Sequence, residues 1–188
     1  MWRNTADSYG RVSILLHWLI AAVVPGLFVL GLWMVELDYY DAWYHRAPEL
    51  HKGTGVLLLG VVLFRLAWRL GNPQPLLTGT PPQRRLAHTM HRVLYGILFA
   101  VIISGYLVST ADGRPIDVFG LVELPSVLSG IDRQEDIAGV IHLVLAICLI
   151  GLIALHALAA LKHHLIDHDR TLIRMLSSKP PVNSHRQS

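Results

Sequence analysis

Several histidines in this sequence lie inside apolar stretches, where ionisable side chains are costly and usually functional. Two of them, His142 and His156, belong to the apolar stretch 138–162. An α-helix turns about 100° per residue, so fourteen residues bring the second imidazole back to within about 40° of the first. At a rise of about 1.5 Å per residue, the two rings are about 21 Å apart along the axis. One helix face therefore carries imidazoles at two depths, which suggests two stacked cofactor sites.

The composition of the chain indicates that these histidines are carried by the helices of a membrane protein. Of the 188 residues 53% are hydrophobic and 15% are charged, whereas soluble proteins have about 25% charged residues. A membrane-spanning helix needs about 20 apolar residues. We therefore expect an all-α membrane protein, a four-transmembrane-helix bundle with one domain over 1–176 and a disordered cytoplasmic tail at 177–188. The four expected spans are 12–35, 51–70, 86–109 and 138–162.

The charges predict how the bundle is oriented. The two terminal segments and the loop 71–85, with the charges near their span ends, hold twelve lysines and arginines against three acidic residues. The loops 36–50 and 110–137, counted in the same way, hold four lysines and arginines against ten acidic residues. Because positive loops stay in the cytoplasm, both termini are predicted to be cytoplasmic. The basic pI of 9.2 then reflects this topology and anionic lipid, and a nucleic-acid partner is not expected.

With this topology each intramembrane histidine has a depth. His17 and His156 each lie six residues, or about 9 Å, from the cytoplasmic end of their spans. His51 opens its span on the outer side, where His142 also lies. Depth thus pairs His17 with His156 and His51 with His142, on different helices, as in bis-histidine ligation of a b-type haem. Small residues one turn away would let a porphyrin approach the backbone or would serve helix packing: Ala21, Gly55, Gly139 and Ala160.

Five segments resemble the bacterial cytochrome b561 family. They read R-V-S-I-L-L-H-W-L, E-L-H-K-G-T-G, L-A-H-T-M-H-R-V-L-Y, H-x13-H with A-L-A-A-L-K-H-H, and D-R-T-L-I-R-M. The resemblance covers about residues 8–176, and S-T-A-D-G-R-P-I-D-V-F-G is most similar to the cytochrome b561 homologue subgroup of proteobacteria. It implies a di-haem b cytochrome, multi-pass in the bacterial inner membrane. By resemblance, the axial ligands would be His17, His156, His51 and His142.

Three further residues are candidates for cofactor binding. Arg65 follows His51 by fourteen residues, so it shares that face at the inner depth, where it could pair with a haem propionate or a quinone oxygen. Lys52, beside an outer ligand, could pair with a propionate or attract an anion. In the resembled family a histidine at the position of His163 is associated with a quinone site, and a histidine there could exchange protons at neutral pH. A polar helix end also often carries histidine without a special role.

His88 and His91 lie three residues apart on one face of the third span, at its cytoplasmic end. They could touch a haem edge or a quinone. They could equally be polar residues of the membrane interface, which is the interpretation we favour here.

The resemblance implies transmembrane electron transfer through two haem b groups. Electrons would move between a ubiquinone site near the cytoplasmic side and a periplasmic redox partner, with membrane lipid around the bundle. One family member oxidises superoxide and passes the electrons to ubiquinone. If this chain is an enzyme, we expect a quinone-linked oxidoreductase of the superoxide:ubiquinone type, although net acidic outer loops would not by themselves attract an anion.

Two other functions stay open from the sequence. One is a membrane-anchor cytochrome subunit of a larger oxidoreductase, such as a hydrogenase or formate dehydrogenase. The other is a non-haem di-iron membrane enzyme built on histidine boxes, suggested faintly by His88-x-x-His91 and His163-His164. Such an enzyme gathers its ligands at one surface, whereas His51 and His142 are expected at the other. The sequence does not indicate the direction of electron flow.

Overall fold

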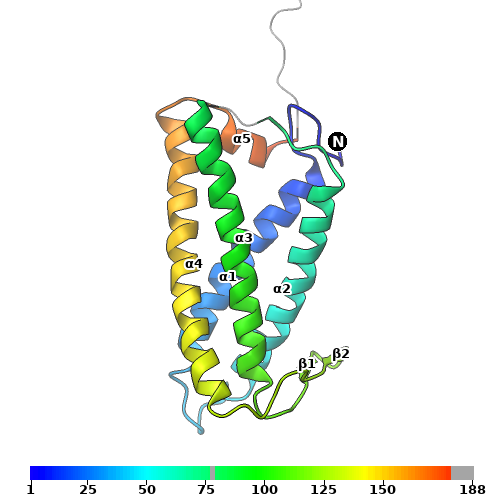
Figure 1. Cartoon of the computed structure of the whole chain (residues 1–188), viewed down its shortest axis with the longest axis vertical. Helices are drawn as coiled ribbons and strands as arrows, with labels where there is room; N and C mark the ends of the chain where they lie inside the picture. The colour runs from blue at the N-terminus through cyan, green and yellow to red at the C-terminus, as the bar shows by residue number, and fades with distance from the viewer. Residues whose placement is uncertain (77–78, 179–188) are drawn as a thin grey trace, which may run out of the picture.

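The computed structural model describes residues 1–76 and 79–178, and over these residues four helices are long and apolar enough to span a membrane. An antiparallel hairpin of two strands and one short helix complete the fold (Figure 1). The expected helical bundle is confirmed. In chain order the elements are α1 (Arg11–Met34), α2 (Arg46–Leu70), α3 (Pro81–Ser109), β1 (Ile116–Val118), β2 (Val122–Leu124), α4 (Gln134–Leu165) and α5 (Thr171–Leu176).

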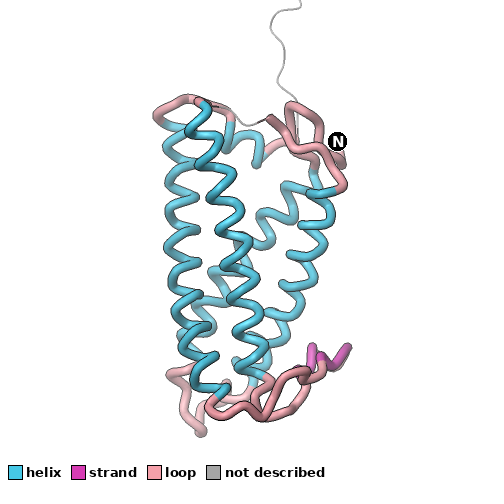
Figure 2. The backbone as a smooth tube through the Cα atoms, viewed as in Figure 1, coloured by secondary structure: helices cyan, strands magenta, loops and turns pink. Residues whose placement is uncertain are grey.

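The four long helices form two closely packed pairs, α3 with α4 and α1 with α2. Figure 1 shows α3 and α4 side by side along the whole bundle, whereas α1 crosses at an angle behind them. The N-terminal segment and α5 lie at one end of the bundle. The β-hairpin lies at the other end, as Figure 1 and Figure 2 show. The bundle therefore has two chemically different ends, one of which carries both terminal segments.

Hydrogen bonds tie the segments at the terminal end together. The amide of Leu76 donates to the carbonyl of Ala6 at 3.0 Å. The guanidinium of Arg174 in α5 donates to the carbonyl of Leu76 at 2.7 Å, and the indole of Trp18 in α1 donates to the carbonyl of Met175 at 2.7 Å. Helix α5 is thus docked against α1 and the loop before α3. The tail expected to be disordered, 177–188, falls from residue 179 onward outside the described residues.

Three of the long helices, α2, α3 and α4, begin four or five residues earlier than the hydropathy of the sequence suggested. Helix α3 begins at Pro81 because Thr80 and Gln83 form a capping box, in which the Thr80 amide donates to the Gln83 side chain at 2.7 Å. Helix α4 begins at Gln134, whose buried side-chain amide donates to the carbonyls of Leu107 and Leu128. Hydropathy finds only the part of a helix that lies in lipid, whereas caps and hydrogen bonds decide where the helix ends.

The segment 110–137, expected to be an irregular loop, contains the hairpin of β1 and β2. Its register pairs Ile116 with Leu124 and Val118 with Val122. Ile116 and Val118 are buried, and β1 packs against α2. At the tip Phe119 has a φ of 55°, rare for a bulky residue, and its ring lies so close to Gly53 that a Cβ there would be 2.8 Å from it. The contact with Gly53 holds the hairpin against the start of α2.

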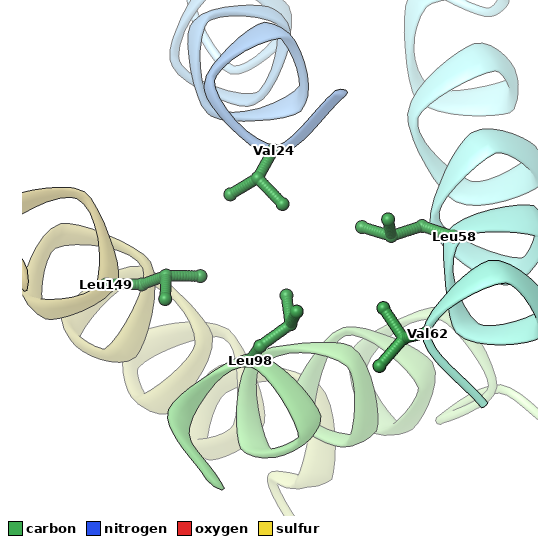
Figure 3. Close-up of a cluster of buried hydrophobic side chains, with 5 residues drawn as sticks. All are labelled: Val24, Leu58, Val62, Leu98 and Leu149. Atoms are coloured by element: carbon green, nitrogen blue, oxygen red, sulfur yellow. The ribbon is translucent and has the colours of Figure 1, made fainter. Parts of the chain in front are cut away.

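A buried apolar cluster occupies the middle of the bundle. Figure 3 shows its five side chains pointing toward one another from all four long helices. On α4, Leu149 lies seven residues from both His142 and His156. Seven residues make nearly two full helical turns, so all three share one face. The cluster therefore forms an apolar layer midway between the two levels of histidines. Its members are Val24, Leu58, Val62, Leu98 and Leu149.

Candidate functional site

The outer pair expected from the sequence is brought together. The rings of His51 in α2 and His142 in α4 have centroids 6.1 Å apart and planes at 78°. The Nδ1 atom of His51 is buried and has no hydrogen-bond partner among the described residues. A buried polar atom without a partner is costly, which is typical of a place where a ligand belongs.

His142 is held by helix α3. Its Nδ1 lies 2.9 Å from the carbonyl oxygen of Val101, which can only accept, so this nitrogen donates. The hydroxyl of Ser104 donates to the same carbonyl at 2.9 Å, and its oxygen is 3.2 Å from Nδ1 of His142. With Nδ1 protonated, Nε2 is the nitrogen left for a metal. Sequence spacing along α4 could not reveal this, because the partner is the backbone of another helix.

The inner pair is also brought together. The rings of His17 in α1 and His156 in α4 have centroids 6.4 Å apart and planes at 68°. Arg65 of α2 lies beside this pair, with Nη2 3.4 Å from Nδ1 of His17. The guanidinium donates to the Tyr95 hydroxyl and lies over the Tyr95 ring, 5.4 Å from its centroid. Arg65 thus reaches the inner level, as its spacing from His51 predicted.

A third imidazole belongs to the inner level, that of His91, for which the sequence interpretation had favoured a place at the membrane interface. The ring of His91 in α3 is 5.4 Å from that of His156, closer than the ring of His17. His88 is exposed instead, so only one of the two α3 histidines faces the bundle. His91 precedes Gly105 by fourteen residues, so the two share one face of α3. Because Gly105 contacts His142 at the outer level, this spacing places His91 at the inner level. The pairing of His156 with His17 stays a prediction.

The two pairs fit the dimensions of bis-histidine ligation. A metal lies about 2 Å from an imidazole nitrogen and half a ring adds about 1 Å, so two axial imidazoles need about 6 Å between their centres. The centroid separations of 6.1 and 6.4 Å meet this requirement. Among the described residues, no group of three or more His, Cys, Asp or Glu could hold a metal ion. A macrocycle would have to supply the remaining ligands at each level.

Two glycines other than those named from the sequence touch the outer histidines. A Cβ on Gly105 would lie 2.9 Å from Cε1 of His142, and one on Gly31 would lie 3.1 Å from Cε1 of His51. A Cβ on Gly55 or Gly139 would meet nothing within 4 Å. The imidazoles therefore rest on the backbones of α1 and α3, while the predicted glycines leave open space.

The remaining candidates lie near the two ends. Lys52 is half-buried next to His51 in α2. His163 lies near the end of α4, where its Nδ1 is 2.9 Å from an oxygen of Asp167 and 3.1 Å from one of Asp169. Lys162 binds the same Asp167 carboxylate at 2.7 Å. The acidic partners of His163, which the sequence interpretation did not name, come from the turn between α4 and α5.

Comparison with known proteins agrees with this geometry. The family model for prokaryotic cytochrome b561 matches residues 8–178. The chain belongs to the prokaryotic cytochrome b561 family. This family, with four apolar helices, indicates a multi-pass protein of the bacterial inner membrane that takes part in electron transfer and contains b-type haem. The resemblance seen in the sequence motifs is thereby confirmed.

Three curated cytochrome b561 relatives match nearly the whole chain. Cytochrome b561 homolog 2 of Escherichia coli K12 is 50% identical over 175 residues, which cover 92% of this chain and 93% of that protein. A protein of Yersinia pestis named probable superoxide oxidase CybB is 29% identical over 178 residues, covering 91% and 97%. Cytochrome b561 homolog 1 of E. coli K12 is 28% identical over 175 residues, covering 90% and 97%.

Proposed function

We propose that this chain carries single electrons across the inner membrane through two bis-histidine b haems. One haem would be held by His51 and His142, the other by His17 and His156. The observation that carries the proposal is the presence of two imidazole pairs, each contributed by two helices, at opposite levels of one bundle. A bound b haem supplies a one-electron couple at its iron.

The protein's own residues would hold, orient and separate the two groups. The hydrogen bond from His142 to Val101 fixes the orientation of its imidazole. Between the levels lies the apolar cluster that includes Leu98 and Leu149. This apolar layer would separate the two haems along the bundle.

The inner level would exchange electrons with ubiquinone near the cytoplasmic ends of the helices. His163 supports this assignment because its Nδ1 lies within ion-pair distance of two carboxylates, those of Asp167 and Asp169. A histidine at this place could exchange a proton with a quinone oxygen. The imidazole would then take up or release a proton while Asp167 and Asp169 lie beside it.

The outer level would meet a periplasmic redox partner. A cavity of about 360 Å³ opens at the start of α2, and its lining includes Leu50, which precedes His51 in the chain. Because the Yersinia pestis relative is named a probable superoxide oxidase, superoxide is the first electron donor to test. The cavity is lined by Trp43, Arg46, Glu49, Leu50 and Phe119.

The haem count and the assignment of ligands are tested together. Purified protein should show a b-type reduced-minus-oxidised spectrum and two haems per chain by the pyridine haemochrome method. His142→Ala and His156→Ala should each leave one haem. Stopped-flow mixing with superoxide and with ubiquinol should then reduce the haems of the wild-type protein. A wild-type protein without haem, or retention of both haems in both variants, would overturn the proposal.

A further inference from the structure

The two levels differ in what lies beside the ring nitrogens of their histidines. At the outer level, Nδ1 of His142 faces two oxygen atoms, the carbonyl of Val101 at 2.9 Å and the hydroxyl of Ser104 at 3.2 Å. At the inner level, Nδ1 of His17 faces the guanidinium of Arg65 at 3.4 Å. One imidazole is therefore next to electron-rich acceptors, and the other is next to a positive charge.

A hydrogen bond from Nδ1 to an oxygen acceptor makes an axial imidazole a stronger electron donor to the iron. The Val101 carbonyl draws the Nδ1 proton of His142 toward itself, which increases the negative charge on the ring and its basicity. A more basic ligand stabilises the oxidised iron relative to the reduced iron, because the oxidised iron carries one more positive charge. The outer haem should accordingly be the harder of the two to reduce.

A buried cation acts in the opposite direction. Arg65 is half-buried, and it forms no ion pair with any residue that the structure describes. Its described polar contacts are with the hydroxyl of Tyr95 and the ring of His17. In a medium of low dielectric, a positive charge opposes additional positive charge nearby. Reduced iron at the inner level is therefore favoured.

We propose that Arg65 at the inner level and the Val101 carbonyl at the outer level give the two haems different reduction potentials, the inner one higher. This order of potentials would favour the outer-to-inner electron flow that the proposed superoxide donor requires. The inference rests on the proposed haem ligation. It adds a tuning residue for each haem.

The experiment measures each haem separately by optical redox titration in detergent. His142→Ala isolates the inner haem and His156→Ala isolates the outer haem. At one ambient potential, the reduced-to-oxidised ratio of the inner haem should be at least tenfold higher, a difference of about 59 mV for one electron. Equal potentials, or the opposite order, would overturn the proposal. Absence of haem from the wild-type protein would instead refute the proposed function.

Arg65 is tested within the same His142→Ala background. Arg65→Gln should lower the reduced-to-oxidised ratio of the inner haem about tenfold, and Arg65→Lys, which keeps the charge, should restore most of it. Arg92→Gln is the matched control, because Arg92 is an exposed arginine next to His91 in the chain. Arg65→Gln combined with His156→Ala should leave the outer haem unchanged.

One further outcome separates tuning from simple haem retention. If Arg65 served only to retain the haem, Arg65→Gln would lose haem without shifting the potential of the fraction that remains. That result would overturn the tuning role. A shift of equal size in Arg65→Lys or in Arg92→Gln would overturn it as well.

Discussion

Gly105 of α3 lies directly against the imidazole of His142 of α4. A Cβ on this glycine would be 2.9 Å from Cε1 and 3.1 Å from Nδ1 of the ring. Val101, one turn earlier on α3, accepts the hydrogen bond from the same ring. The imidazole is thus held from two sides by the backbone of one helix, and its position depends on the absence of a side chain at residue 105.

Gly105→Val should therefore release the outer haem. The added atoms must displace the imidazole, and a displaced axial ligand cannot keep both its metal bond and its bond to Val101. We expect the haem content to fall from two per chain to about one. Gly96→Val is the control on the same helix, because a Cβ there meets nothing within 4 Å. Equal haem loss in both variants would refute the packing explanation.

The inner level holds three imidazoles but an axial pair needs two. The expected ligands are His17 and His156, so His91→Ala should keep both haems, whereas His17→Ala should lose one. Haem content by pyridine haemochrome checks both variants. If His91→Ala lost a haem and His17→Ala retained it, His91 would be the second inner ligand, in agreement with its shorter distance of 5.4 Å to His156.

The carboxylates around His163 should matter for the quinone reaction and not for haem binding. With Asp167→Asn and Asp169→Asn together, neither carboxylate lies beside the imidazole, and proton transfer to quinone should slow at least tenfold, since positioned acid–base groups contribute about 10²–10⁴-fold. Oxidation of the reduced haems by a short-chain ubiquinone measures this rate. Asp7→Asn, an exposed acid in the N-terminal segment, is the control. An unchanged rate would argue against a quinone site at His163.

Both terminal segments lie at one end of the bundle, and the charge distribution predicts that this end is cytoplasmic. A cysteine scan tests this orientation in a Cys148→Ser background, since Cys148 is the only cysteine and is exposed. In intact spheroplasts a membrane-impermeant maleimide should label Tyr40→Cys, between α1 and α2. It should label Gln74→Cys, between α2 and α3, only after permeabilisation. The reverse pattern would invert the topology.

The helices themselves followed from composition, because a stretch of about 20 apolar residues has few alternatives to a membrane-spanning helix. The depth of each histidine in the membrane also followed from the sequence, because it depends only on the distance from the end of its apolar stretch. The spacing of His51 to Arg65 and of His142 to His156 showed that two helices each carry one residue for each level. The hairpin at 116–124 was missed, because its strands are only three residues long and pack on α2.

The structure shows that all four long helices share one pattern. Each presents two site residues fourteen positions apart, with a member of the apolar cluster midway between them. Seven residues return a helix to within about 20° of its starting direction, so all three lie on one face. The four sets are His17, Val24 and Gly31; His51, Leu58 and Arg65; His91, Leu98 and Gly105; and His142, Leu149 and His156.

What the sequence by itself determined is therefore a face and a depth for each of these residues. Only the tertiary structure decided which faces meet. It placed His91 next to His156, the Val101 carbonyl next to His142, and Arg65 next to His17. The reason is physical: helical periodicity acts within one helix, whereas the neighbour across the bundle depends on how helices tilt and pack, and a backbone carbonyl has no sequence signature.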